Sequence, residues 1–409
     1  RYGSGGRARA GVGEMGCSGI RSRPVPPAWA QDPISQAKFH EQNILAEKIG
    51  EGGYGSVYAV RRAKDEASRY AAKVVGVGGG VATEMVRREL QAWQRVTATG
   101  SRFVVHLAEA FVEGSFCYMV MERCDQALPG ALKSCETLTE DTYRPVFKQM
   151  LQGLAAIHVA GVVHRDVKPD NFLCVGAGSE RVVKLCDFGL AQVVPDASRR
   201  MLRGINGTAP YLAPEMVKDH RYNAKVDVWS FGVIVYVLFF GHLPYTPLVF
   251  TEAEMLLAIG DGLPAPTFVP RLRGRPDDVP EESISAAAED FVMALLRRSP
   301  RARPMASEAL QHKFFSDPSA VQARSLRPML DSAEWCGAFG PPQCAAYAVP
   351  TEIDVEMSAL QEQHGHACMW SRRTSASPGS IPPGSFMASS PASSCRAGAT
   401  TETPGHSFH

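Results

Sequence analysis

One run of eight residues constrains the fold of this chain more than any other stretch: His164-Arg165-Asp166-Val167-Lys168-Pro169-Asp170-Asn171, followed downstream by Asp187-Phe188-Gly189. Each fragment could arise by chance. Together they supply a carboxylate that can accept a proton, a lysine that can offset phosphate charge, and two oxygen-bearing side chains suited to a hard metal ion. The sequence therefore predicts a fold that brings both segments into one site for phosphoryl transfer to a hydroxyl.

The side chains of these segments have separate predicted roles. Asp166 is predicted to accept the proton of the attacking hydroxyl, and Lys168 to offset charge on the transferring group. Asn171 and Asp187 are the predicted Mg²⁺ ligands, because this ion prefers oxygen and keeps phosphates and waters in its shell. Taken singly, Asp166 would more often be a helix cap or a turn residue, so the prediction rests on the other residues of the two segments.

A glycine-rich segment lies between two strand-like runs, with glycines at 50, 52, 53 and 55 and a valine at 57. Gly50, Gly52 and Gly55, with Val57 behind them, are predicted to let backbone N–H groups approach the oxygens of a triphosphate. A plain glycine-rich hairpin is the alternative. A dinucleotide-binding reading is excluded because a second strand, and no helix, follows the glycines.

Tyr70-Ala71-Ala72-Lys73 ends the next strand-like run. Ala71 and Lys73 are predicted to contact the nucleotide, and Lys73 to hold its phosphates with the help of a helix carboxylate. Glu89 is the first choice for that carboxylate and Glu84 the second. The alternative is that Lys73 is a surface lysine and Glu89 a solvated helix charge.

The run from Met119 to Cys124 is predicted to be a strand that leads into a hinge. By register, Met121, Glu122 and Cys124 are expected around an adenine ring, with Leu173 lining the same pocket. Cys186 lies behind that pocket, and a buried structural role is expected for it.

Composition limits the class of protein. Of the 409 residues 45% are hydrophobic, and the formal net charge is +1, so no electrostatic argument favours nucleic acid as a partner. The ten cysteines are scattered, which predicts reduced thiols and a cytoplasmic protein. Residues 1–43 are predicted to be a disordered arm, 44–315 a folded domain, and 316–409 a largely disordered tail.

Within the domain, periodicity predicts two parts. Strands are expected at 44–49, at 56–60, in a run that ends at Lys73, at 103–112 and at 116–121. One main helix is expected at 82–96. Beyond residue 124 helices are expected at 143–158, 226–240, 286–298 and 306–312, and a long functional loop at 187–215.

These motifs resemble those of the eukaryotic protein kinase superfamily over roughly residues 44–315. The resemblance continues in Gly207–Glu215, Asp227–Gly232 and Arg301–Pro304. It implies an α+β, two-lobed protein kinase fold: a small five-stranded β lobe at 44–122 with one main helix, a hinge at 122–125, and a larger, mainly helical lobe at 126–315. ATP and Mg²⁺ are the implied cofactors.

The resemblance also implies particular contacts. Thr208 is expected to contact Asp166 and Lys168, and Arg303 to pair with Glu215. A hydrophobic stack that marks an assembled active state is expected from four side chains: Leu107, Trp93, Phe188 and His164.

Lys168 and the segment ending at Glu215 resemble serine/threonine kinases, most closely the calcium/calmodulin-dependent and calcium-dependent group. The implied activity is transfer of the γ-phosphoryl group of Mg·ATP to Ser or Thr hydroxyls of protein substrates. The alternative is a pseudokinase, a nucleotide-binding scaffold with the same fold.

The sequence departs from the family pattern at several positions. Gly204 stands where many relatives carry a phosphorylated residue, so activity is expected either to need no phosphate there or to use Ser198. Asp170 could receive a substrate arginine, whereas Leu128 and Val237 replace two acidic determinants of the cyclic-AMP-dependent kinase. A preference for basic substrates therefore stays open.

The flanking segments carry weaker signals. No EF-hand loop is visible, and Arg372-Arg373-Thr374-Ser375 resembles a basophilic phosphorylation site in a region expected to be solvated. Membrane anchoring by acylation is conceivable only if translation starts at Met15, which would expose Gly16 and Cys17.

Overall fold

The structure, a computed structural model, describes residues 35, 37–52, 55–62, 65–77, 80–135, 138–269 and 284–316. Predictions for Met15 and its neighbours and for the tail at 372–375 lie outside these residues. Among the described helices, none combines the length and apolar character needed to cross a membrane.

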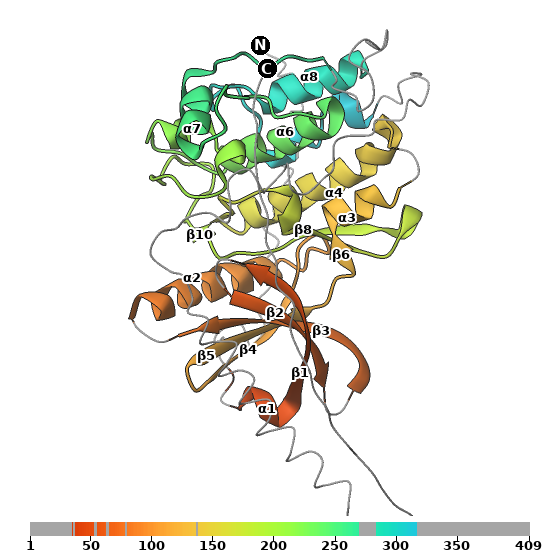
Figure 1. Cartoon of the computed structure of the whole chain (residues 1–409), viewed down its shortest axis with the longest axis vertical. Helices are drawn as coiled ribbons and strands as arrows, with labels where there is room; N and C mark the ends of the chain where they lie inside the picture. Colours follow the sequence, from red (N-terminus) through yellow and green to blue (C-terminus); the bar gives the residue numbers. More distant parts are fainter. Residues whose placement is uncertain are drawn as a thin grey trace, which may run out of the picture. The chain divides into compact units, whose positions relative to one another are not determined.

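The small lobe is built on one antiparallel sheet (Figure 1), which confirms the predicted five strands. The strands are β1 Asn43–Gly52, β2 Gly55–Arg62, β3 Asp65–Gly76, β4 Leu107–Glu113 and β5 Phe116–Glu122. Their order across the sheet is β1-β2-β3-β5-β4, so β3, which carries Lys73, lies at the centre. A central strand is paired on both sides, which holds its side chains in place.

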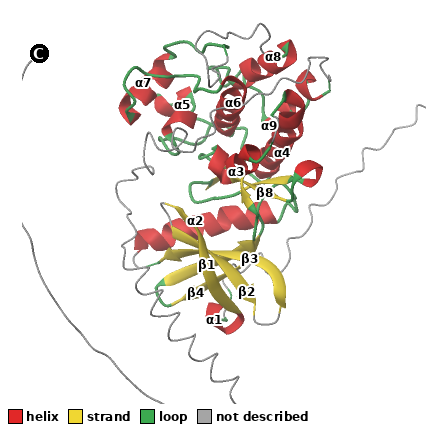
Figure 2. Cartoon of the chain, turned by 45° about the vertical axis from the view of Figure 1, so that its right-hand side comes forward, coloured by secondary structure: helices red, strands yellow, loops and turns green. Residues whose placement is uncertain are grey.

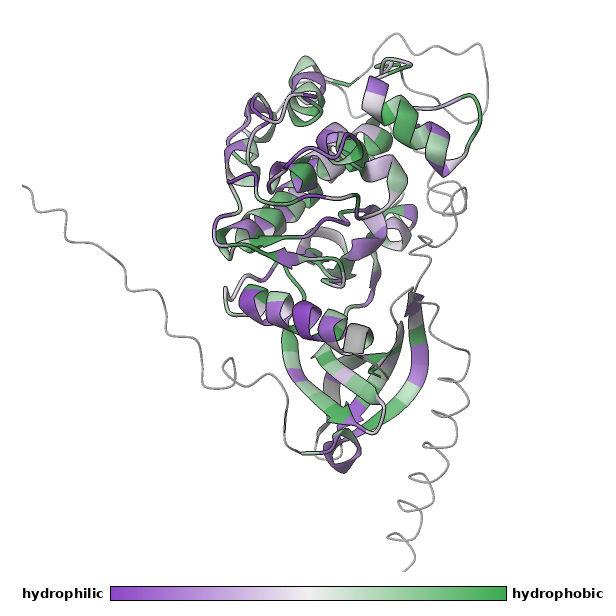
Figure 3. Cartoon of the chain, turned by 90° about the vertical axis from the view of Figure 1, so that its left-hand side faces the viewer, coloured by the Kyte–Doolittle hydropathy of each residue, from purple (hydrophilic) through white to green (hydrophobic). Residues whose placement is uncertain are grey.

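The two faces of this sheet are covered differently. Side chains alternate along β5, so Cys117 and Met119 join the core that includes Leu90 and Trp93 of helix α2, Gly80–Thr97. Hydrophilic and hydrophobic segments alternate along the strands and along the helix that lies over them (Figure 3). The opposite face of β5 presents Tyr118, which has a separate partner.

That partner comes from the N-terminal side of the domain and corrects one prediction. A short helix, α1 Phe39–Gln42, precedes β1, and Phe39 is fully buried. Its ring stacks on Tyr118 at 4.3 Å between centroids and meets Phe111 edge-on at 5.7 Å. The prediction of a disordered arm through residue 43 is therefore wrong at its end, because burying one Phe contributes about 1.5–3 kcal/mol and fastens the segment.

The large lobe is mainly helical (Figure 2), as predicted. Its helices are α3 Leu128–Lys133, α4 Glu140–Val159, α5 Pro214–Val217, α6 Lys225–Phe240, α7 Glu252–Asp261, α8 Ala286–Leu295 and α9 Ala306–Ala309. Short strands complete it: β6 Gln126–Ala127, β7 Val162–Val163, β8 Phe172–Val175, β9 Val182–Leu185 and β10 Gln192–Val193. Every residue of α6 from Val226 to Phe240 is buried, which suits a helix that is apolar on all sides.

Several predicted boundaries shift. The strand expected from 103 begins only at Leu107, because the preceding segment pairs with the other lobe: Val105 N donates to Leu185 O at 2.8 Å. The helix expected to reach residue 298 ends at Leu295, and the one expected to reach 312 ends at Ala309. A segment from the small lobe thus runs beside the strand that leads to Asp187.

Candidate active site

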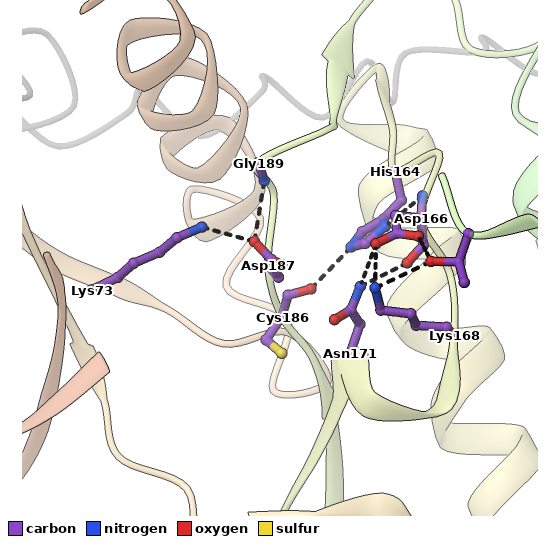
Figure 4. A network of polar contacts seen from close by, with 9 residues as sticks. Lys73, His164, Asp166, Lys168, Asn171, Cys186, Asp187 and Gly189 are labelled. Carbon is purple, nitrogen blue, oxygen red and sulfur yellow. Dashed lines mark hydrogen bonds and ion pairs between the residues drawn. The ribbon is translucent and has the colours of Figure 1, made fainter. Parts of the chain in front are cut away.

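Lys73 lies between two carboxylates from different parts of the chain. Its Nζ is 2.7 Å from Glu89 Oε1 on α2 and 2.9 Å from Asp187 Oδ1 in the large lobe. Figure 4 shows Lys73 reaching across to Asp187. Glu89 is only 4% exposed, whereas Glu84, the second choice, is on the surface with Arg87 and Arg88. The prediction of Glu89 as the partner of Lys73 is confirmed.

The charges of this trio depend on one another. Burial acts to lower the pKa of Lys73, but the carboxylates of Asp187 and Glu89 outweigh it and raise that pKa above its usual value. Burial acts in the opposite sense on Asp187, where Lys73 prevails and lowers the pKa to about 2. Burial raises the pKa of Glu89, against the pull of Lys73. Lys73 is therefore a fixed positive charge between the two lobes.

The glycine-rich turn and the residues around Lys73 are in register. Gly50 is opposite Val57 on β1 and β2, and Val57 is opposite Lys73 on β3. Gly55 has φ +151°, and a Cβ there would lie 2.4 Å from Val74 O, so only glycine fits. On the next ladder Ala71 is opposite Met121. The structure thus brings the predicted nucleotide residues of the small lobe together.

The second group of polar side chains belongs to the large lobe. Lys168 Nζ donates to Asp166 Oδ2 at 2.8 Å and to Thr208 Oγ1 at 3.2 Å. Thr208 Oγ1 in turn donates to Asp166 Oδ1 at 2.7 Å. Both contacts predicted for Thr208 are confirmed. The arrangement fixes the Asp166 carboxylate with a cation beside it, which suits a group that must accept a proton next to phosphate charge.

Asn171 and Asp187 fit the oxygen donors that Mg²⁺ prefers. Asn171 Nδ2 donates to Asp166 O at 2.7 Å, and its oxygen points away from Asp166 (Figure 4). Asp187 has φ +60°, and its Oδ1 accepts from Gly189 N at 3.4 Å. No group of three or more His, Cys, Asp or Glu side chains in the described part of the chain forms a metal site. An amide and one carboxylate suit an ion whose remaining ligands are phosphates and waters.

The segment from His164 to Asn171, named here the catalytic loop, is anchored by Asp227. The sequence motif did not disclose this role of Asp227. Its carboxylate is fully buried and accepts from His164 N, Arg165 N and His158 Nε2, each at 2.9 Å. Arg165 has φ +69°, a strained conformation for a residue with a side chain. Three hydrogen bonds to one buried carboxylate offset that strain. The available signal was an acidic residue at the start of an otherwise apolar helix.

The hinge carries an ion pair that sequence reasoning also missed. Lys184 Nζ on β9 is 3.0 Å from Glu122 Oε1, which also accepts from His106 N at 2.9 Å. Cys124 follows in the hinge, half-buried, and Leu173 lies on β8 beside β6, at the start of the large lobe. The side chain of Glu122 therefore ties the hinge to the strand that leads to Asp187.

Two further predicted arrangements are present. Phe188 lies between Trp93 and His164, with ring centroids 5.9 and 5.5 Å away, and Leu107 is buried in the same core. Arg303, itself buried, pairs with Glu215 through Nη1 at 2.7 Å and Nη2 at 3.1 Å. The hydrophobic stack is therefore assembled, and the predicted Arg303–Glu215 pair is confirmed.

The segment between Asp187 and Glu215 is ordered by protein contacts. Leu202 and Tyr222 exchange backbone hydrogen bonds of 3.2 and 2.9 Å, and Gly204 N donates to Asp219 Oδ1 at 3.3 Å. Arg165, the residue before Asp166, donates through Nε to Leu190 O at 2.7 Å. Gly207 has φ +121°, and a Cβ there would lie 2.3 Å from Arg165 O. The loop thus closes tightly on the catalytic segment.

Comparison with known proteins agrees with this geometry. The family described as protein kinase domain matches residues 44–315. CDPK-related kinase 8 of Arabidopsis thaliana is 34% identical over 326 residues, which cover 75% of this chain and 51% of that protein. CDPK-related protein kinase of Daucus carota is 34% identical over 293 residues, covering 70% and 46%. Serine/threonine-protein kinase PEPKR2 of Arabidopsis thaliana is 30% identical over 319 residues, covering 77% and 61%.

The chain spans about half the length of the first of these relatives. The family match contains Lys73, Asp166 and Asp187. The family match covers both lobes and the hinge between them. On this evidence the chain belongs to the protein kinase family.

Proposed function

We propose that this chain is an active serine/threonine protein kinase that transfers the γ-phosphoryl group of Mg·ATP to hydroxyls of protein substrates. The observation that carries the proposal is the closed set of hydrogen bonds among Asp166, Lys168 and Thr208. Two relatives are named serine/threonine-protein kinases, which supports Ser and Thr hydroxyls as the phosphoryl acceptors. Turnover in the range usual for such enzymes, about 1–100 s⁻¹, is expected.

Each step assigned to this chain follows from where its charges lie. Lys73, held by Glu89, positions the phosphates, and Asp166 accepts the proton of the substrate hydroxyl as it attacks. Lys168 is next to the same carboxylate and offsets charge on the group in transit. Asn171 and Asp187 would hold Mg²⁺, which when bound neutralises phosphate charge. Catalysis is thus mainly positioning and electrostatics.

A pseudokinase is the competing proposal. Proteins of that kind usually lack the lysine, the catalytic-loop aspartate or the metal-binding aspartate. Lys73, Asp166 and Asp187 are all present here, and Lys73 contacts both Glu89 and Asp187. The assembled stack at Phe188 further favours activity.

Of the three positions compared with the cyclic-AMP-dependent kinase, Asp170 alone carries an acidic side chain that could receive a substrate arginine. Leu128 is 1% exposed and Val237 is 5% exposed, so neither side chain is available to a substrate. Asp170 is half-buried near Lys168. The choice between basic and other substrates therefore depends on residues outside the two positions that act in the cyclic-AMP-dependent kinase.

We also propose that activity requires no phosphate on the segment between Asp187 and Glu215. The contacts of Leu202 with Tyr222 and of Gly204 with Asp219 do the ordering that a phosphate would otherwise do. Ser198 is engaged with Asp196, since its Oγ donates to Asp196 Oδ1 at 2.6 Å.

The test is transfer of radiolabelled phosphate by the full chain onto an arrayed Ser/Thr peptide library, before and after phosphatase treatment, with Asp166→Asn as the control. Transfer by both preparations, absent from the control, is expected, and the array would also give the sequence preference. Nucleotide binding without transfer by either preparation would instead support the pseudokinase.

A further inference from the structure

A second polar cluster lies in the large lobe, outside the residues assigned to phosphoryl transfer. We name it the Cys135 cluster: Cys135, Tyr143, Cys174 and Arg181. Cys135 follows helix α3, Tyr143 is on α4, Cys174 is on β8, and Arg181 precedes β9. Helix α3 lies next to β8 (Figure 2).

Arg181 places a positive charge directly on the sulfur of Cys135. Its Nη1 is 3.5 Å and its Nη2 3.6 Å from Cys135 Sγ, and both donate to it. The thiol itself donates to Ala131 O at 3.4 Å. The backbone of Arg181 is held by Gln149, whose Nε2 donates to Arg181 O at 3.1 Å. A guanidinium in this position stabilises negative charge that develops on the sulfur when it acts as a nucleophile.

Two buried donors of the cluster are left without acceptors. The Tyr143 hydroxyl belongs to a fully buried side chain stacked on Phe147, and neither it nor Arg181 Nε has a hydrogen-bond partner among the described residues. Burial raises the pKa of Tyr143, and the nearby Cys135 thiol raises it further. An unsatisfied buried donor costs roughly 1–3 kcal/mol, so two of them in one small cluster require a reason.

An oxygen atom added to the sulfur would supply the missing acceptor. A sulfenate carries a negative oxygen that can accept from donors around it, whereas a thiol offers only a weak sulfur acceptor. Cys135 is half-buried, so a small oxidant can reach it. The thiol form of the cluster thus has more donors than acceptors, and the oxidised form would correct that imbalance.

In the other four thiols of the described part of the chain, burial disfavours the thiolate. Burial raises the pKa of Cys117 and Cys124 to about 12 and that of Cys174 to about 11, and it raises that of Cys186 well above its usual value. These four sulfurs are therefore held as thiols, the weakly nucleophilic form.

We propose that Cys135 is a site of reversible oxidation by hydrogen peroxide, with the resulting sulfenate held by Arg181 and Tyr143. The sulfur, having released its proton to solvent, attacks one peroxide oxygen. The S–O bond forms as the O–O bond breaks, the sulfur loses two electrons, and the departing hydroxide takes a proton to become water. A thiol reductant reverses the change.

The test treats the full chain with hydrogen peroxide, traps sulfenic acid with dimedone, and follows the label at each cysteine by peptide mass spectrometry. Cys135 is expected to be labelled about tenfold faster than Cys124 or Cys186. Labelling of Cys135 at or below the rate of those two would overturn the proposal.

Variants separate this chemistry from mere exposure. Arg181→Gln should slow labelling of Cys135 about tenfold, whereas Arg69→Gln, which removes an exposed arginine elsewhere, should leave it unchanged. Arg181→Lys keeps the positive charge and serves if the glutamine variant fails to fold. Tyr143→Phe should shorten the life of the sulfenate without slowing its formation. Equal rates for the wild type, Arg181→Gln and Arg181→Lys would refute the role given to the guanidinium.

Discussion

Two groups of polar side chains meet at the active site, and they are held together in different ways. The interlobe cluster, Lys73, Glu89 and Asp187, joins residues from β3, α2 and the segment after β9. The catalytic-loop cluster, Asp166, Lys168, Asn171 and Thr208, lies wholly in the large lobe.

This difference indicates which part of the active site can be regulated. The interlobe cluster exists only while the two lobes are apposed, because Lys73 belongs to the small lobe and Asp187 to the large lobe. The catalytic-loop cluster is fastened by Asp227 on helix α6, so all of its contacts lie within the large lobe. Assembly of the nucleotide side is therefore the step open to control.

The largest effect is expected from the catalytic-loop cluster. Asp166→Asn removes the proton acceptor and should lower turnover by about 10²–10⁴-fold, with ATP affinity and stability nearly unchanged because the interlobe cluster is untouched. Steady-state kinetics, with ATP binding measured separately, check this. Asp141→Asn, an exposed residue in the first turn of α4, is the matched control. Near-normal turnover by Asp166→Asn would remove Asp166 from the role assigned to it.

The interlobe cluster should respond in both activity and stability. Lys73→Met leaves Glu89 buried without its cation, which should cost about 3–5 kcal/mol in the free energy of unfolding and also abolish phosphate positioning. Adding Glu89→Gln should restore much of the stability but none of the transfer. Denaturant unfolding and kinetics of both variants are the measurements, with Lys48→Met on the surface of β1 as the control. An inactive but fully stable Lys73→Met would show that the pair is not structurally coupled.

The anchor of the catalytic loop can be weakened separately. Asp227→Asn keeps the shape of the side chain but loses the charge that strengthens three hydrogen bonds, so the free energy of unfolding should fall by about 2–3 kcal/mol. Turnover should fall more than ATP affinity, because Lys73 and Glu89 are distant from this anchor. If ATP affinity falls as much as turnover, the two clusters are not independent.

The pKa of Asp187 predicts a pH effect of known sign. The pKa of Asp187 is about 2 in the folded chain, whereas an unperturbed aspartate has a pKa of 3.8. Between these two values the unfolded chain therefore binds more protons than the folded chain. The stabilisation from Asp187 is therefore complete above about pH 4 and is lost as pH falls towards 2. As pH falls from about 5 to about 3, the free energy of unfolding should decline more steeply for the wild type than for Asp187→Asn. Parallel curves would contradict the depressed pKa.

The smallest effect is expected at Ser198. Ser198→Ala removes one exposed hydrogen bond to Asp196, and turnover should change by less than about twofold. Phosphatase-treated wild type and Ser198→Ala should then have equal rates. Loss of activity in the variant would mean that Ser198, and not the other protein contacts alone, orders the segment between Asp187 and Glu215.

Much of the site could be predicted from sequence because its chemistry depends on residue type at fixed spacing. Asp166, Lys168 and Asn171 are neighbours in one turn of chain, and the glycines around Gly55 are required by close backbone approach. The sequence offers both Glu89 and Glu84, and the burial of Glu89 beside Lys73 decides between them. Helix ends were less predictable, since the terminal turns of α8 and α9 are decided by neighbouring segments.

Other features had no local signal. Phe39 lies in a polar stretch, and only the aromatic face formed by Phe111 and Tyr118 shows that it is buried. The pair between Lys184 and Glu122 joins residues far apart in sequence, each of which alone would pass for a surface charge. The Cys135 cluster likewise brings together four elements.

The sequence by itself determined the family, the reacting groups and the order of the two lobes, because motifs of defined spacing admit few other chemistries. Only the tertiary structure decided which charges are paired, which thiol lies against a guanidinium, and that Asp227 carries the catalytic loop. The physical reason is that these properties depend on burial and on distances between segments remote in the chain, and local sequence encodes neither.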